Sequence, residues 1–157
     1  MKIKLLFIGK ENAGYFHDAI TDYTQKLKYY ISFESIAIPY LKSTKSWSPE
    51  ELKSKEKELL LKKIDPTDYV VLLDESGIEM TSVRFSEFLA RQQNVGTKNV
   101  TFVIGGIYGF APEMYQRANF KLSLSQMTLP HILARLLFLE QLYRACTILK
   151  GEPYHHA

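Results

Sequence analysis

The sequence DYVVLLD at Asp68–Asp74 and the sequence NVTFVIGG at Asn99–Gly106 decide the fold class. Each holds an apolar run of strand length, interrupted only by Thr101 in the second, without the alternation of apolar and polar residues that a strand with one face in water shows. Such runs are typical of strands that are buried on both faces at the centre of a parallel sheet. The sequence therefore predicts a sheet covered by helices on both sides.

The segments around these two strands continue the pattern. Ser48, Pro49 and Glu51 have the spacing of a capping box with proline in the first turn, so a helix is expected to start there and run to about Ile64. The dipeptide Ser76-Gly77 is expected to turn the chain. Further strands are predicted at Lys2–Ile8, Ser32–Ile38 and Phe120–Leu124, and further helices at Ala13–Tyr30, at Ser82–Gln93, from Pro112, and at Pro130–Lys150, the last of them ending in Gly151. This alternation over 157 residues predicts a single α/β domain with a mainly parallel sheet.

The composition excludes several classes of protein. With 46% hydrophobic and 24% charged residues, the chain has the make-up of a globular domain and not of a disordered one. The single cysteine, Cys146, excludes an internal disulfide, and the longest apolar stretch carries Arg135, Glu140 and Arg144, which excludes a membrane span. The first ten residues turn polar too quickly for a signal peptide, so we expect a cytoplasmic protein. A net charge of +3 permits an anionic partner such as RNA and fits a slightly basic surface equally well.

Ligands of open parallel sheets bind at the carboxyl ends of the strands, and three such ends are informative. Asp74 and Glu75 follow the first quoted strand, where they either accept hydrogen bonds from a ribose or an amine, or form a turn or a helix cap. Gly105 and Gly106 follow the second, where they either let a ligand approach the backbone closely or form a tight turn. The dinucleotide-binding pattern G-x-G-x-x-G and the P-loop pattern are both absent from the sequence, which disfavours these two classes.

The third strand end leads into Leu124–His131, a loop between a strand and a helix. This loop is rich in small polar residues. It offers backbone amides and hydroxyl groups but little charge. It therefore suits a neutral, hydrogen-bonding ligand such as adenine better than a phosphate.

The last helix is apolar around nearly its whole circumference, which indicates burial on every side and, at the end of a small domain, a homodimer interface. Glu140 and Arg144 lie four residues apart on it and are expected to pair, either as a structural ion pair or with Arg144 near an anionic group of RNA. After the helix, Tyr154, His155 and His156 form either an unstructured tail or a set of rings that stack on a base or move a proton. Two adjacent histidines without a further His or Cys cluster predict no metal site.

Taken together, several stretches resemble a known family. They are Phe102–Gly106 with Gly109, Leu122–Ser125 followed by Met127–His131, Glu140–Ala145 and Pro153–His155, together with the opening Met1–Gly9. In this order the set is similar to the RlmH (YbeA-type) family of ribosomal RNA large-subunit pseudouridine methyltransferases. The resemblance extends over essentially the whole chain, including its length.

The resemblance implies a fold and an activity that periodicity cannot give. The fold would be the SPOUT-type α/β-knot, a trefoil knot in which the carboxyl-terminal segment threads through a loop. The knot and a dimerisation helix would occupy about residues 120–150, and an active-site tail would occupy residues 151–157. The family forms homodimers and uses S-adenosylmethionine, without a metal, to methylate N3 of a pseudouridine in the 23S ribosomal RNA of the assembled ribosome.

The resemblance also assigns residues position by position. It assigns cofactor binding to Leu73, Gly105 and the run Leu124, Ser125, Gln126, Met127, Thr128 and Leu129, and it places His131, Glu140, Arg144, Tyr154 and His155 near the catalytic centre. Our hypothesis is that His155 or a nearby water takes the proton of the target imide nitrogen, that Arg144 stabilises the resulting anion, and that Glu140 orients Arg144. The family often has Arg or Lys where this chain has His156, which predicts a weaker, pH-dependent contact with RNA phosphate at that position.

Two other functions stay open from the residues alone. One is a non-catalytic ribosome- or RNA-binding module on the same fold, which has no need to bind the cofactor. The other is a hydrolase with a Ser/His/Asp set drawn from residues such as Ser125 and His131. The absence of a G-x-S-x-G motif from the sequence counts against the hydrolase.

Overall fold

Five parallel strands form one sheet in the order β2-β1-β4-β3-β5. The structure is a computed structural model and describes residues 1–42 and 45–156. The strands are β1 (Lys2–Ile8), β2 (Ser32–Ile38), β3 (Tyr69–Glu79), β4 (Asn99–Ile104) and β5 (Phe120–Ser123), and the helices are α1 (His17–Leu27), α2 (Pro49–Leu61), α3 (Ser82–Asn94), α4 (Pro112–Arg117) and α5 (His131–Lys150), with a 3-10 turn η1 (Gly14–Phe16) before α1. The predicted α/β fold with a parallel sheet is confirmed.

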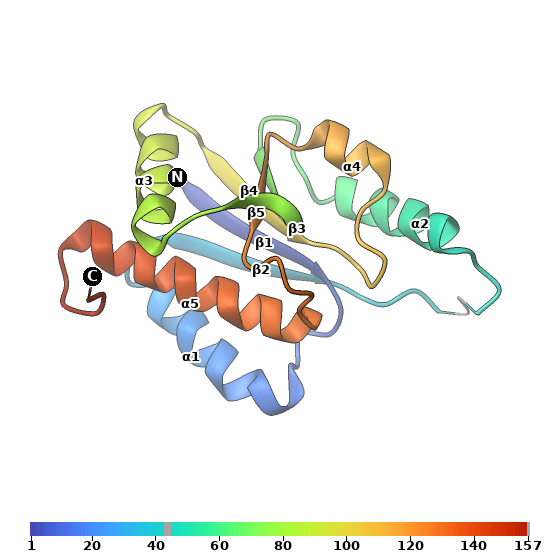
Figure 1. The fold of residues 1–157 in the computed structure, drawn as a ribbon, viewed down its shortest axis with the longest axis horizontal. Helices are drawn as coiled ribbons and strands as arrows, with labels where there is room; N and C mark the ends of the chain where they lie inside the picture. Colours follow the sequence, from blue (N-terminus) through green and yellow to red (C-terminus); the bar gives the residue numbers. More distant parts are fainter. Residues whose placement is uncertain (43–44, 157) are drawn as a thin grey trace.

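Helices cover both faces of this sheet (Figure 1). On one face α1, α3 and α5 pack on an apolar core that includes Leu5, Phe102 and Phe138. On the other face α2 and α4 pack on a second core that includes Leu6 and Val103. Because successive residues of a strand point to opposite faces, an unbroken apolar run supplies both cores at once. The two-sided burial predicted from the apolar runs is therefore confirmed.

The first helix is shorter than the predicted Ala13–Tyr30. Gly14 has a φ of +57°, and the chain makes the 3-10 turn Gly14–Phe16 before α1 begins at His17. At the other end α1 stops at Leu27. The spacing of apolar residues found the helix but could not locate its ends, because capping and not periodicity sets them.

The predicted turn at Ser76-Gly77 is wrong, because β3 runs through it to Glu79. The pairing of β3 with β5 shifts register between Leu73 and Ile78. Ser76 and Gly77 therefore lie in an irregular stretch of one strand. A β-carbon on Gly77 would come within 2.7 Å of the carbonyl carbon of Lys121 in β5. Glycine is needed here for the close approach of two strands and not for a change of chain direction.

Two helix ends follow the predicted chemistry. The side chain of Ser48 accepts a hydrogen bond from the backbone of Glu51 at 3.1 Å and the side chain of Glu51 accepts one from the backbone of Ser48 at 2.9 Å, which completes the capping box of α2. Gly151 ends α5 with a φ of +70°. Both ends are local features, which explains why the sequence revealed them.

The burial of α5 is incomplete within one chain. Phe138, Leu139 and Leu142 are fully buried, whereas Leu133 and Leu137 are only half-buried and belong to neither apolar core. In residues 1–42 and 45–156 no helix is long and apolar enough to cross a membrane. The threading of the carboxyl-terminal segment into a knot stays a prediction, and Ala157 of the predicted tail lies outside the described residues.

A buried polar network joins three strands at the end of the sheet opposite the strand carboxyl ends. Asp68, which is 3% exposed, accepts hydrogen bonds from Lys4 at 3.2 Å, Thr101 at 2.8 Å and Asn99 at 2.9 Å. Lys4 also bonds Asp65 at 2.9 Å. Burial opposes the charge of Asp68, but these hydrogen bonds outweigh it and lower the pKa of its carboxyl group. The network fastens the start of β3 to β1 and β4.

Candidate functional site

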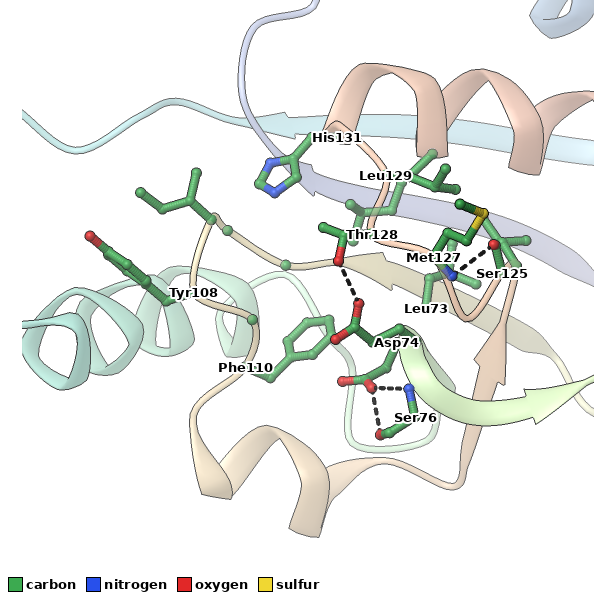
Figure 2. Close-up of a pocket in the computed structure, with 18 of the residues that line it drawn as sticks. Leu73, Asp74, Ser76, Tyr108, Phe110, Ser125, Met127, Thr128, Leu129 and His131 are labelled. Atoms are coloured by element: carbon green, nitrogen blue, oxygen red, sulfur yellow. Dashed lines mark hydrogen bonds between the residues drawn. The ribbon is translucent and has the colours of Figure 1, made fainter.

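A cavity of about 610 Å³ opens beside the middle of β3 and at the carboxyl ends of β4 and β5 (Figure 2). Three segments far apart in the sequence meet there: the middle of β3, the glycine-rich turn after β4 and the loop after β5. Of the predicted cofactor-binding residues, the cavity brings together Leu73, Gly105, Leu124, Ser125, Met127, Thr128 and Leu129. Gln126 is exposed and does not line it.

The middle of β3 contributes two carboxyl groups to the cavity lining. Asp74 accepts hydrogen bonds from the backbone N–H of Ser76 at 2.8 Å, from the hydroxyl of Ser76 at 2.6 Å and from the hydroxyl of Tyr115 in α4 at 2.5 Å. Burial opposes ionisation of Asp74, but these donors outweigh it and lower the pKa of its carboxyl group. The contact of Asp74 with Ser76 is local, but both residues lie within β3, so Asp74 forms neither the turn nor the helix cap that the sequence left open. Glu75, its neighbour, also lines the cavity.

The loop after β5 is held against β3 by side-chain bonds. The hydroxyl of Thr128 donates to Glu75 at 3.2 Å, and the amide of Gln126 donates to Glu79 at 3.3 Å. Within the loop, the backbone N–H of Met127 donates to the hydroxyl of Ser125 at 3.0 Å (Figure 2). These bonds give a short loop with little apolar anchoring a defined shape.

The turn after β4 approaches its neighbours as closely as glycine allows. A β-carbon on Gly105 would lie 3.1 Å from the ring of Phe110, and one on Gly106 would lie 2.2 Å from a carboxyl oxygen of Glu56 in α2. Glu56 is only 7% exposed, and burial raises the pKa of its carboxyl group. Gly109 closes the turn with a φ of +79° and donates its N–H to the carbonyl of Gly106 at 3.0 Å. The paired glycines thus form both a tight turn and a surface that a ligand can approach.

His131 lies at the first position of α5 and lines the same cavity (Figure 2). Burial lowers the pKa of its imidazole, and a hydrogen bond with the backbone of Gly106 opposes this only in part. His131 is therefore neutral at pH 7 and connects α5 to the glycine turn. Its position is with the cofactor-binding residues and not with the other predicted catalytic residues.

Glu140, Arg144, Tyr154 and His155 form a second cluster at the other end of α5. Nε of Arg144 donates to Glu140 at 3.1 Å, which confirms the predicted pair, and this bond raises the pKa of the guanidinium. The hydroxyl of Tyr154 donates to Glu140 at 3.1 Å, and the guanidinium carbon lies 4.7 Å from the centre of the Tyr154 ring. Nδ1 of His155 lies 3.4 Å from Nη1 of Arg144.

The tail is therefore docked on α5 and is not free of structure. Besides Glu140, Tyr154 meets the Tyr23 hydroxyl at 3.5 Å and packs edge-on against Tyr143 with ring centres 4.9 Å apart. Burial raises the pKa of the Tyr154 hydroxyl, so Tyr154 acts as a hydrogen-bond donor at neutral pH. The hydroxyl of Tyr30 donates to Glu152 at 2.6 Å, which fixes the start of the tail.

The two clusters are far apart in one chain. His131 and Arg144 are thirteen residues apart on α5, which at the rise of an α-helix corresponds to about 20 Å. Figure 1 shows the carboxyl terminus beside the end of α5 that lies away from the β4–α4 turn. One chain thus presents a cavity at one end of α5 and a charged, aromatic cluster at the other.

The sequence analysis missed the lining residues Ile107, Tyr108, Phe110, Tyr115 and Ala134, and it missed Glu56, which packs against Gly106 without lining the cavity. Tyr115 lies in a helix that shows no sign of a contact with β3, and Glu56 lies in a helix whose many charges indicate an exposed face. Neither could have been found by spacing, because both reach the site through contacts between distant segments. Among the described residues, no group of three His, Cys, Asp or Glu side chains is arranged to hold a metal ion.

Comparison with known proteins identifies a family and several relatives that are all described as methyltransferases. A family model described as "Predicted SPOUT methyltransferase" matches residues 1–155. The chain is 51% identical over 156 residues to a protein of Parabacteroides distasonis and to one of Christiangramia forsetii, and 49% identical to one of Bacteroides thetaiotaomicron. Each of the three is named ribosomal RNA large subunit methyltransferase H, and each match covers 99% of both chains.

Solved structures give a weaker likeness. The SpoU methyltransferase AviRb of Streptomyces viridochromogenes, solved in complex with AdoMet, matches with a TM-score of 0.45 and 12% identity over 96% of this chain and 59% of that chain.

Proposed function

The chain belongs to the SPOUT methyltransferase family, and we propose that it transfers a methyl group from S-adenosylmethionine to N3 of a pseudouridine in the 23S ribosomal RNA of the assembled ribosome. The observation that carries this proposal is the cavity, which gathers from three distant segments nearly all of the residues that the family resemblance assigns to the cofactor. The shared name of the relatives supports ribosomal RNA as the substrate.

The cavity fits the cofactor in size and chemistry. Its volume of about 610 Å³ lies in the range of small-molecule sites. Gly105 lets a flat ring approach the backbone, Leu73 and Leu129 offer apolar contact, and Ser125 and Thr128 offer hydroxyl groups. When bound there, the cofactor supplies an electrophilic methyl group on a sulfonium centre. The enzyme must then hold the acceptor nitrogen in line with that methyl group and keep water out.

We propose that a homodimer completes the site. Within one chain Arg144 lies ten residues along α5 from Ala134, which lines the cavity, and this corresponds to about 15 Å, too far for Arg144 or His155 to reach a base held there. The half-buried Leu133 and Leu137 leave an apolar face on α5 that a second copy would cover. A two-fold arrangement of the α5 helices would bring the cluster of each chain toward the cavity of its partner.

In this site the second cluster would stabilise the negative charge that develops on the target base and accept its proton. The imide nitrogen of the target is protonated at neutral pH and becomes a good nucleophile when the proton leaves. A guanidinium only donates hydrogen bonds, so Nδ1 of His155 accepts in its long contact with Arg144. The substrate would replace this contact, so that Arg144 binds the developing anion and Nδ1 of His155 receives the proton. Glu140 holds Arg144 in position, and Tyr154 packs against its guanidinium.

The remaining assignments follow from the same activity. The chain would act as a single cytoplasmic domain over residues 1–157, with the knot and dimerisation helix at about 120–150 and the active-site tail at 151–157. Its partners would be a second copy and the ribosome.

Calorimetric titration with S-adenosylmethionine tests the cofactor assignment. We expect binding by the wild-type protein and loss of binding in Gly105→Trp, because a large side chain would collide with Phe110 and fill the cavity. No binding by the folded protein, alone or with ribosomes present, would contradict the proposal and favour a ribosome-binding module.

Methylation of isolated ribosomes tests the base. We expect His155→Ala to bind S-adenosylmethionine normally but to methylate ribosomes at least tenfold more slowly, because it lacks the proton acceptor. Full activity of this variant would show that His155 is not the base.

A further inference from the structure

The cofactor cavity carries a negative charge. Its lining includes two carboxyl groups, those of Asp74 and Glu75, and among the described residues it includes no Lys or Arg. His131 adds no compensating charge at neutral pH, because burial lowers the pKa of its imidazole. Of the residues that the family resemblance assigns to the cofactor, none is charged, so this charge comes from groups outside that set.

The two carboxyl groups differ in how far their oxygens are occupied. Asp74 accepts three short hydrogen bonds from Ser76 and Tyr115, so its oxygens are already partly occupied by groups of the protein itself. Glu75 accepts one side-chain bond from the described residues, from the hydroxyl of Thr128 to Oε2 at 3.2 Å, the bond drawn at Thr128 in Figure 2. The Oε1 atom of Glu75 therefore remains available to a ligand.

The methyl-transfer reaction changes the charge of the molecule in the cavity. As the acceptor nitrogen forms its bond to the methyl carbon, the bond from that carbon to sulfur breaks and its electron pair stays on sulfur. S-adenosylmethionine, a sulfonium cation, becomes the neutral thioether S-adenosylhomocysteine. Because the rest of the molecule is the same, a fixed negative charge in the cavity distinguishes the two by charge alone.

We propose that Glu75 is a specificity-determining residue that, with Asp74 beside it, makes the cavity hold cationic S-adenosylmethionine more tightly than its neutral product. This inference rests on the proposed function and goes beyond it, since it states which form of the cofactor the chain prefers and why the product leaves. A carboxylate within a few ångströms of the sulfonium, in a cavity open to water, corresponds to a preference of about tenfold.

A second role of Glu75 must be separated from this one. Through Thr128 it also holds the loop after β5, and loosening of that loop would weaken the binding of both ligands. Glu79 provides the matched control: it lies in the same strand and accepts a hydrogen bond from Gln126 of the same loop, but it does not line the cavity. Glu75→Gln and Glu79→Gln therefore remove the same charge and each leave an amide oxygen that can accept the loop hydrogen bond, and only the first removes charge from the cavity.

The test is calorimetric titration of the wild-type protein, Glu75→Gln and Glu79→Gln with S-adenosylmethionine, S-adenosylhomocysteine and sinefungin, in which an ammonium group replaces the sulfonium centre. We expect the wild-type protein to bind both cations about tenfold more tightly than S-adenosylhomocysteine. Added salt should weaken the binding of the two cations and leave the binding of S-adenosylhomocysteine unchanged. Glu75→Gln should lose most of this preference through weaker cation binding, while Glu79→Gln should keep it.

Two results would overturn the inference and leave the proposed function standing. One is equal affinity of the wild-type protein for the cations and the neutral product. The other is a Glu75→Gln variant that weakens all three ligands by the same factor, as a loop contact would. Failure of the wild-type protein to bind any of the three ligands, alone and with ribosomes present, would instead contradict the proposed function, and this inference with it.

Discussion

Gly106 packs so closely against a buried carboxyl group that a side chain at this position would collide with it. A β-carbon there would lie 2.2 Å from Oε2 of Glu56, which is itself only 7% exposed. On the other side, Gly106 shares a hydrogen bond with His131. The glycine turn of the cavity is thus held between α2 and the start of α5, and its shape depends on a residue that does not line the cavity.

We expect Gly106→Ala to lower the free energy of unfolding by about 1–3 kcal/mol, because the Glu56 carboxyl group must leave its place. Binding of S-adenosylmethionine should weaken as the turn shifts. The double variant Gly106→Ala/Glu56→Ala should recover most of the loss, since the methyl group then occupies freed space. Urea unfolding of both single variants and the double variant measures the coupling, and strictly additive effects would contradict the packing argument.

The buried carboxylate of Asp68 should make stability depend on pH. The pKa of its carboxyl group is lower in the folded chain than in the unfolded one, so the unfolded state binds more protons between the two values. The stabilisation is complete above about pH 4, the unfolded value, and is lost as the pH falls through the folded pKa. Asp68→Ala should cost about 3–5 kcal/mol at pH 7, because it leaves Lys4 without one of its buried partners.

Urea unfolding from pH 7 to pH 3 checks this expectation. The wild-type protein should lose stability toward pH 3, and Asp68→Asn should be less stable at pH 7 and depend less on pH. Parallel pH profiles for the two proteins would assign the acid sensitivity to other carboxyl groups.

Among the elements, β3 joins the sheet to the cavity. It pairs with β4 over its first half, shifts register after Leu73, and continues beside β5 to Glu79. Gly77 lies so close to β5 that a β-carbon would meet the backbone of Lys121 and Leu122 at 2.7–2.8 Å. Because β5 runs directly into the loop that lines the cavity, any separation of these strands moves that loop.

Gly77→Ala should therefore lower the free energy of unfolding by about 2–3 kcal/mol and weaken S-adenosylmethionine binding together with it, since backbone atoms cannot turn aside as a side chain can. Ile78→Ala is the control, because Ile78 is next in the strand and 59% exposed, and it should change stability by about 0.5 kcal/mol or less. Chemical unfolding and calorimetry measure both quantities. Equal stability of Gly77→Ala and the wild-type protein would contradict the close approach.

For the whole molecule, the separation of the two clusters along α5 has a consequence for the dimer. If each site takes its cavity from one chain and Arg144 and His155 from the other, two defective chains can complement one another. Gly105→Trp removes the cavity and Arg144→Ala removes the second cluster. Each variant alone should be inactive, while in a mixed dimer one site has both parts intact.

Random re-association of equal amounts of these variants should restore about a quarter of the wild-type ribosome methylation, since half of the dimers are mixed and each has one intact site. Mixing without subunit exchange is the control and should give no activity. Absence of recovery in a mixture shown to contain mixed dimers would place both clusters of a working site in one chain.

The sequence by itself determined the elements whose signals are local. The apolar runs of β3 and β4 identified a parallel sheet covered on both faces, the capping box located the start of α2, and the spacing of Glu140 and Arg144 predicted their pair. The family resemblance, and not periodicity, supplied the cofactor-binding residues that the cavity brings together.

Only the tertiary structure decided how these pieces meet. The course of β3 through Ser76 and Gly77 depends on its pairing with β5, and the positions of Tyr115 and Glu56 beside the cavity depend on helices that pack from other parts of the chain. The position of the cavity at the start of α5, away from Arg144, depends on how α5 packs across the sheet. Local sequence patterns record which face of an element is apolar, but contacts between distant segments are fixed only when those faces pack together.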